Sequence, residues 1–219
     1  MKEKLAIVIP AYKADFLRDA LESIASQTSQ QFHLYIGDDN SPQDLYSIVR
    51  SFEGRIDLTY KKFDANLGGQ DLVAHWDRCI DLTHDEEWIW LFSDDDVMGS
   101  DCVETFFEGL RQNEGTDLFH FNIKVIDRNG QPVKTCNPFP ERMAVNDFFS
   151  QRISTRSTAL WLNIYFQEKS ICNPALSISI WPGARMMPRG SNLAATEELL
   201  HWQAQRYISG KAALTFHPI

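Results

Sequence analysis

The sequence lacks three features that would place it in a familiar functional class. It has no run of about eighteen apolar residues, so no membrane-spanning helix is expected. Its four cysteines form no CxxC pair, which excludes the usual spacing of a zinc knuckle or a redox dithiol. Basic residues are also scarce, because 21 Lys and Arg face 30 Asp and Glu and the net charge is -9. A general nucleic-acid binder needs a concentrated basic surface, so an anionic ligand would here need a local device such as a metal ion.

In other respects the composition is typical of a globular protein from a reducing compartment. The 219 residues are 43% hydrophobic, which is enough to bury one substantial core. Cys79, Cys102, Cys136 and Cys172 lie far apart, and each is expected to be a small core residue. A predicted strand begins within a few residues of the N-terminus and leaves no room for a signal peptide. We therefore expect a soluble, cytoplasmic protein, with contact to the inner face of the membrane limited to a peripheral one.

Strand and helix patterns alternate along the first half of the chain. Continuous apolar runs predict strands at residues 5–12, 32–37, 56–60 and 88–92, with amphipathic helices between them. This order predicts an α/β fold with a doubly wound, mostly parallel sheet and helices on both faces, whose ligands bind beyond the carboxyl ends of the strands. Later patterns predict a helix over 102–110, one long strand over 116–127, a short strand over 177–180 and a helix over 195–209.

Three adjacent carboxylates, Asp94, Asp95 and Asp96, directly follow the apolar run 88–92. Because like charges at the end of a buried strand repel one another, a positive partner is expected. Mg²⁺ and Mn²⁺ prefer oxygen ligands, and Mg²⁺ sites use one or two carboxylates together with water and substrate phosphates. The alternative is a solvated acidic loop, and the three residues alone do not decide between the two.

Polar segments also follow three other predicted strands, at residues 9–13, 38–41 and 66–69. Asp39 has the chemistry to accept a hydrogen bond from the ring N–H of a nucleotide base. The alternative is that the Asp-Asp-Asn-Ser segment only caps a turn or a helix start. Similarly, Asn66 and Gly68 either form a plain turn with a positive-φ glycine or let the backbone approach a diphosphate.

Taken together and in this order, the four segments resemble family 2 of the GT-A glycosyltransferases, inverting enzymes that use nucleotide-diphospho-sugars. The resemblance covers about the first 125 residues and is looser beyond them. It implies a GT-A fold in which residues 1–127 form the nucleotide-sugar-binding half and residues 128–219 a smaller acceptor-binding half of one catalytic domain. The chain is short for this family, which implies a minimal or truncated domain.

The resemblance also implies roles for individual residues. Asp39 would bind the base, Asp94 would reach the ribose or the metal, and Asp95 would bind the metal as the last acid of the DxD-type motif. The further nucleotide-binding positions would be Pro10, Ala11, Tyr12, Asn66 and Gly68, and the further metal positions Asp96 and His217. Two departures stand out: Phe92 replaces an acid that many members carry, and residues 75–78 replace an Ala-Arg-Asn run. Arg78 in that stretch is either a contact to the diphosphate or one half of a helix-surface salt bridge.

An acidic pair in the second half of the chain, Glu197 and Glu198, matches the pair that opens a helix in the acceptor half of the family. The resemblance implies that Glu198 is the catalytic base and that Glu197 supports it. The alternative is that both residues only favour the N-terminal end of a helix.

The function implied by the resemblance is transfer of a sugar from a UDP-sugar to a hydroxyl of a surface polysaccharide or lipid-linked glycan, assisted by Mn²⁺ or Mg²⁺. Nucleic acid is not an expected partner. One alternative is a GT-A-like module that binds a nucleotide sugar without transferring it. A sugar-nucleotidyltransferase is a weaker one, because no glycine-rich basic loop follows the first strand. A phosphotransfer receiver domain is disfavoured, since the first strand lacks a terminal acidic pair.

Overall fold

We describe residues 5–113, 118–135, 142–144, 164–167 and 213–217 of a computed structural model of the chain. Four parallel strands form its centre in the order β3-β2-β1-β4. They are β1 (Leu5–Ala11), β2 (His33–Asp38), β3 (Leu58–Lys62) and β4 (Trp88–Leu91). The helices that follow them are α1 (Leu17–Ala25), α2 (Leu45–Arg50), α3 (Leu72–Ile80) and α4 (Cys102–Gln112). The strands and helices predicted over the first 112 residues are confirmed, with ends shifted by a few residues.

Four further strands extend this sheet beyond β4. β9 (Ile164–Gln167) lies between β4 and β5 (Leu118–Phe121) and is antiparallel to both. β10 (Ala213–His217) runs parallel to β5, and β8 (Arg142–Ala144) closes the edge antiparallel to β10. The eight-stranded sheet therefore has the order β3-β2-β1-β4-β9-β5-β10-β8. The prediction of a mostly parallel, doubly wound α/β sheet is confirmed.

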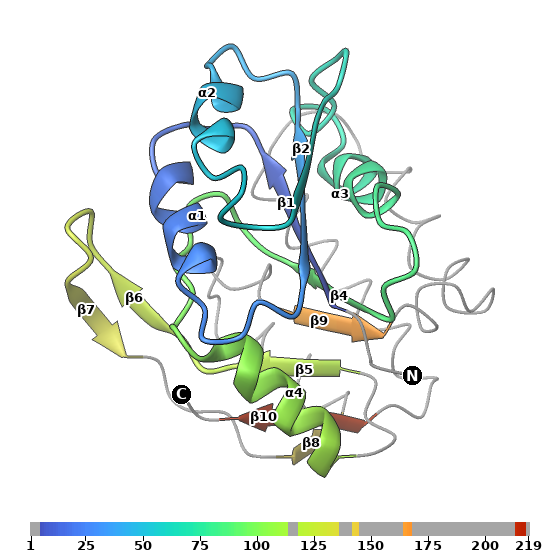
Figure 1. Ribbon diagram of the computed structural model, residues 1–219, viewed down its shortest axis with the longest axis vertical. Coiled ribbons are helices and arrows are strands. Elements are labelled where there is room, and N and C mark those ends of the chain that lie inside the picture. The colour runs from blue at the N-terminus through green and yellow to red at the C-terminus, as the bar shows by residue number, and fades with distance from the viewer. Residues whose placement is uncertain (1–4, 114–117, 136–141, 145–163, 168–212, 218–219) are drawn as a thin grey trace.

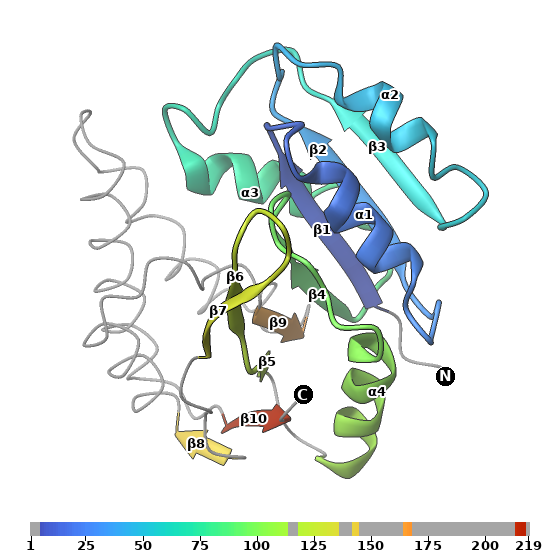
Figure 2. The same ribbon diagram turned by 90° about the vertical axis from the view of Figure 1, so that its left-hand side faces the viewer.

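Helices cover both faces of the sheet because β1 is apolar on both of its faces. Leu5, Ile7 and Ile9 belong to a core cluster with residues of α1, α2 and α4. Ala6 and Val8 point to the opposite face and share a second cluster with Cys79 of α3. Among the helices that the structure describes, Figures 1 and 2 show α3 on the face of the sheet opposite α1 and α2. A strand buried on both faces reads as a continuous apolar run, which is why β1 is recognisable in the sequence.

The predicted long strand over 116–127 is wrong, because the chain leaves the main sheet after Phe121. β5 ends there, and β6 (Lys124–Ile126) pairs instead with β7 (Pro132–Thr135) in a separate two-stranded sheet. Figure 1 shows this hairpin extending away from β5. Its turn contains Gly130 with a φ of +75°, and Asp127 accepts hydrogen bonds there from two backbone N–H groups. Phe121 is buried whereas all of β6 is exposed, so burial ends where the strand does.

The other late elements predicted from the sequence, a strand over 177–180 and a helix over 195–209, lie outside the described residues. Within the described part of the chain, no helix combines the length and apolar character needed to cross a membrane.

Candidate functional site

The polar segments after β1, β2 and β4 meet at one edge of the sheet. Asp94 Oδ2 accepts hydrogen bonds from the backbone N–H groups of Tyr12 (2.8 Å) and Lys13 (3.0 Å). Ser41 Oγ donates to the carbonyl oxygen of Tyr12 (2.7 Å), and the backbone N–H of Asp39 donates to the carbonyl of Ala11 (2.9 Å). Parallel strands place their carboxyl ends together, so three loops that are distant in sequence form one rim.

Asp39 ties this rim to the loop at residues 66–69. Its side chain accepts from the backbone N–H groups of Leu67 and Gly68 (2.8 Å each) and from Asn66 Nδ2 (3.0 Å). The guanidinium of Arg78 supplies a fourth donor. A carboxylate has about four lone-pair positions, and Asp39 is 2% exposed, so these donors use its acceptor capacity.

Gly68 in this loop must be a glycine because the carboxylate of Asp39 lies too close to its Cα for a side chain. A Cβ atom on Gly68 would lie 2.7 Å from Asp39 Oδ2, which is too short for any real contact. Among the described glycines a positive φ occurs at Gly54 and Gly130, and not at Gly68 or Gly69. The prediction that Gly68 or Gly69 supplies a positive φ is therefore wrong. The backbone must come close to the carboxylate for the N–H of Gly68 to reach it.

Turn chemistry is present in the 38–41 segment, but Asp38 supplies it. Asp38 is fully buried, and it accepts from the backbone N–H of Ser41 (2.7 Å) and from the hydroxyl of Tyr60 (2.5 Å). The N-cap of α2 is Asp44, six residues further along. The capping alternative thus applies to Asp38 and not to Asp39, whose side-chain hydrogen bonds lead to the 66–69 loop and to Arg78 of α3.

Arg78 is a member of this site, and its salt bridge is made to Asp39. Its side chain is 22% exposed, lies over the ring of Phe63 at 4.0 Å and donates to the carbonyl of Ala65 (3.0 Å). The interpretation as a salt bridge is right in kind, but the partner is the site's own buried acid. Burying a carboxylate requires such a cation, together with hydrogen bonds to its remaining lone pairs.

No role for His75 was predicted from the sequence, and the structure places it beside the same carboxylate. His75 is 3% exposed, and its Nδ1 accepts from Arg78 Nε (3.2 Å) and lies 3.5 Å from Asp39 Oδ1. Burial lowers the pKa of His75, an effect that the negative charge of Asp39 opposes and the positive charge of Arg78 reinforces. A neutral ring is consistent with an accepting Nδ1. The overlooked signal was the spacing of His75 and Cys79, which share the buried face of α3.

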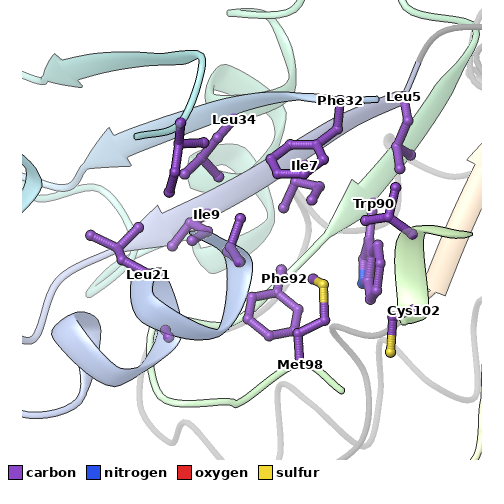
Figure 3. Packing of buried hydrophobic residues seen from close by; sticks show 14 of the residues in the cluster. Leu5, Ile7, Ile9, Leu21, Phe32, Leu34, Trp90, Phe92, Met98 and Cys102 are labelled. Atoms are coloured by element: carbon purple, nitrogen blue, oxygen red, sulfur yellow. The ribbon is translucent and has the colours of Figure 1, made fainter. Parts of the chain in front are cut away.

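The acidic run begins at the core, and of its three acids Asp95 is the exposed one while Asp94 and Asp96 are partly buried. Phe92 is 1% exposed and packs edge-on against Trp90, as Figure 3 shows, so the position where many relatives carry an acid is here a core residue. Burial raises the pKa of Asp94, and so does the charge of Asp95, whereas the N–H groups of Tyr12 and Lys13 lower it.

This donor set fits a hard divalent cation in part. Among the described residues, no group of three or more His, Cys, Asp or Glu side chains is gathered as a metal site would require. A Mg²⁺ or Mn²⁺ ion needs only one or two carboxylates when substrate phosphates and water complete its shell. A nearby cation would also relieve the unfavourable charge on Asp94, so Asp94 and Asp95 are suitable ligands for such an ion.

The remaining predicted residues occupy different parts of the molecule. Pro10 and Ala11 end β1, where Ala11 is fully buried, and Tyr12 exposes 41% of its surface at the rim. His217 ends β10 opposite Phe121, three strands from β4. At about 5 Å per strand, its backbone lies about 14 Å from the strand that carries the acids. Glu197 and Glu198 lie outside the described residues.

Comparison with known proteins identifies what the chain is similar to. The profile of the family described as glycosyl transferase family 2 matches residues 6–190. A search of curated protein sequences finds no match.

Solved structures share the fold at low sequence identity. S. aureus TarS 1–349 in complex with UDP has a TM-score of 0.70 and 15% identity, over 99% of this chain and 60% of that one. TarS 1–349 in complex with UDP-GlcNAc has a TM-score of 0.69 and 15% identity, over 100% of this chain and 59% of that one. A mannosyltransferase from Pyrobaculum calidifontis in complex with GDP-Man and Mn²⁺ has a TM-score of 0.61 and 12% identity, over 100% of this chain and 55% of that one. This chain spans less than two thirds of these proteins.

Proposed function

Since the chain belongs to glycosyl transferase family 2 and has the GT-A fold, we propose that it transfers a hexosyl or N-acetylhexosaminyl group from a UDP-sugar to a hydroxyl of a surface polysaccharide or a lipid-linked glycan. Residues 1–127 would bind the donor and residues 128–219 the acceptor. The observation that carries the proposal is the meeting of three strand-end loops around Asp39 and Asp94. The UDP and UDP-GlcNAc bound by TarS support a uridine nucleotide as the donor.

In this proposal Asp39 recognises the base. Its carboxylate accepts hydrogen bonds from the backbone N–H groups of Leu67 and Gly68, which belong to the protein's own loop. Its fourth donor, Arg78, has a partly exposed side chain. Because four donors already use the acceptor capacity of the carboxylate, a uracil ring N–H would take the place of Arg78 there. Tyr12 lines the same rim with an exposed ring, which suits it to pack against the nucleoside.

Asp95, together with Asp94 and Asp96, would hold Mn²⁺ or Mg²⁺, with His217 as a further candidate. When bound, the cation would neutralise the charge that builds on the departing diphosphate. The Mn²⁺ in the mannosyltransferase complex supports a metal in this reaction. By accepting hydrogen bonds from the backbone N–H groups of Tyr12 and Lys13, Asp94 would hold the three acids next to the loop that follows β1.

Glu198 would remove the proton from the acceptor hydroxyl, which is a poor nucleophile without such help. Direct displacement at the anomeric carbon then inverts its configuration. Glu197 would serve a supporting role, since neighbouring residues of a helix do not share a face. A module that only binds the nucleotide sugar needs Asp39 and the acidic run but has no use for Glu198.

The donor and metal assignments are tested by thermal shift with UDP-, GDP- and dTDP-sugars, with and without Mn²⁺. A ligand that binds only the native state raises the melting temperature, and we expect a metal-dependent rise with a UDP-sugar. Asp95→Asn should abolish the metal dependence, whereas Asp101→Asn, an exposed acid outside the run, should not. Stabilisation by nucleoside triphosphates alone would point instead to a nucleotidyltransferase.

The base is tested separately with an authentic acceptor. Glu198→Gln should lower turnover by about 10²–10⁴-fold and leave UDP-sugar affinity near wild type. Glu197→Gln is the matched control, and a larger loss there would reverse the two roles. If neither change affects transfer, the base lies elsewhere.

A further inference from the structure

Residues 23–28, at the C-terminal end of α1, hold the chain that leaves the acidic run. We call them the α1 clamp. Ser23 Oγ accepts from the backbone N–H of Met98 (3.0 Å), and the backbone N–H of Thr28 donates to the carbonyl of Ser100 (2.8 Å). These contacts join positions more than 70 residues apart in the sequence. Met98, the first residue held in this way, follows Asp96 by two positions.

Gln27 makes the central contacts of the clamp. It is 5% exposed, and its Nε2 donates to the carbonyl oxygens of Gly99 (2.6 Å) and Ser23 (3.0 Å). Its Oε1 accepts from the backbone N–H of Val103 (3.1 Å) in α4. Only an amide both donates and accepts in this way, because an ionised carboxylate has no proton to give and an apolar side chain does neither.

The acidic run is therefore fixed on two sides by different elements. On one side Asp94 accepts from the backbone of Tyr12 and Lys13. On the other side Met98 is 5% exposed in the core cluster and bonded to Ser23; Figure 3 shows it beside Phe92. The three residues 95–97 span the interval between these anchors. A shift of the second anchor moves Asp95 and Asp96 relative to Asp94.

We propose that Gln27 is a positioning residue for metal-dependent donor binding, acting through the 98–103 backbone on Asp95 and Asp96. This inference rests on the proposed function, because it assumes that these acids hold the cation. It assigns a role to a side chain just beyond the C-terminal end of α1, whereas the rim lies at the end where α1 begins. Position 27 requires an amide because the carbonyl of Gly99 needs a donor and the backbone N–H of Val103 needs an acceptor at the same time.

The test is the affinity of Gln27→Glu for Mn²⁺ in the presence of UDP, compared with its affinity for UDP without metal. The part-buried carbonyls of Ser23 and Gly99 lose their donor and face a carboxylate, so we expect metal affinity to fall by about tenfold. Metal-free UDP affinity should stay within about twofold of wild type, because Asp39 lies far from the clamp. Amide hydrogen exchange over residues 95–101 should become faster, a readout that needs no metal.

Two further variants keep the test decisive. Gln30→Glu is the matched control, because Gln30 bonds to two carbonyls of the clamp itself, those of residues 25 and 27, and within the described part of the chain makes no hydrogen bond to residues 98–103. Ser23→Ala is a milder change that removes the acceptor of Met98 together with a hydrogen bond to the carbonyl of Ala20 inside α1, and it should show the same effects to a smaller extent. A general loss of stability would weaken both affinities equally, and such an outcome would overturn the proposal.

The outcomes separate this inference from the proposed function. A wild-type protein whose UDP binding is indifferent to Mn²⁺ contradicts the proposed metal site, and the inference with it. A wild-type protein with clear metal dependence, left unchanged in Gln27→Glu, contradicts the inference alone.

Discussion

Arg78 and Asp39 form an ion pair within the site, and removing the guanidinium of Arg78 should lower the free energy of unfolding. Arg78→Met keeps the stem over Phe63 but removes the guanidinium. Breaking a fully buried pair costs about 3–5 kcal/mol. Arg78 is 22% exposed, and Asp39 keeps three other donors, so we expect a smaller loss of about 2 kcal/mol in the free energy of unfolding.

A double-mutant cycle with Asp39→Asn isolates the pair. The asparagine removes the charge and turns one acceptor into a donor, which leaves a backbone N–H of the 66–69 loop without a partner and costs about 1–3 kcal/mol. Once that charge is gone, loss of the guanidinium matters less. The double variant should therefore lose at least about 1 kcal/mol less than the sum of the single variants in urea unfolding.

The control cycle uses Arg55 and Glu22, an exposed bidentate pair on the molecule's surface. Because solvent screens exposed charges, its coupling should be clearly smaller than that of the buried pair. Additivity within about 0.5 kcal/mol for Arg78 and Asp39 would refute the reasoning.

Three further changes test other contacts. Gly37→Ala would bring a Cβ into Cys79 Sγ, so it should destabilise by about 1–3 kcal/mol, and Cys79→Ala should recover part of that loss in thermal unfolding. His75 has a lowered pKa, so its contribution to stability is present above about pH 6.5 and is lost as the pH falls, by up to about 1.4 kcal/mol per pH unit; His75→Gln should flatten this dependence. In an NMR titration Asp94 should ionise at a higher pH than an exposed aspartate, and Asp95→Asn should lower the pKa of Asp94; an unmoved titration would show that the two carboxylates do not interact.

The first half of the fold could be predicted because its core signal is strong. β1 is buried on both faces, and its apolar run is continuous. The boundary near Phe121 could not be predicted in the same way, because period-two alternation continues from β5 into β6 while the burial that justifies it stops. A pattern records which side chains could face a core, and tertiary packing decides whether a core is there.

The place of the site could be predicted from the sequence, but the side-chain contacts within it could not. Strand ends of a parallel sheet meet, so the convergence of the loops followed from their order. Which aspartate of the pair does what could not be read, because Asp38 and Asp39 are neighbours and project to opposite sides of the chain. One meets Ser41 and Tyr60, and the other meets Arg78 on α3.

The two acidic centres of the rim differ in how their charge is compensated, and this difference indicates where a cation would act. Asp39 is paired with Arg78 and held by three further donors, so the protein itself neutralises it. At Asp94, burial and the charge of Asp95 outweigh two backbone N–H groups and the charge of Lys13, and its pKa is raised. Asp94 and its neighbour thus carry negative charge that the surrounding groups do not fully offset. A protein with a net charge of -9 would attract an anionic diphosphate poorly, and under the proposed function a cation at these acids would supply the missing attraction. The same electrostatics that disfavour an ionised Asp94 in the free protein would then favour metal and donor binding together.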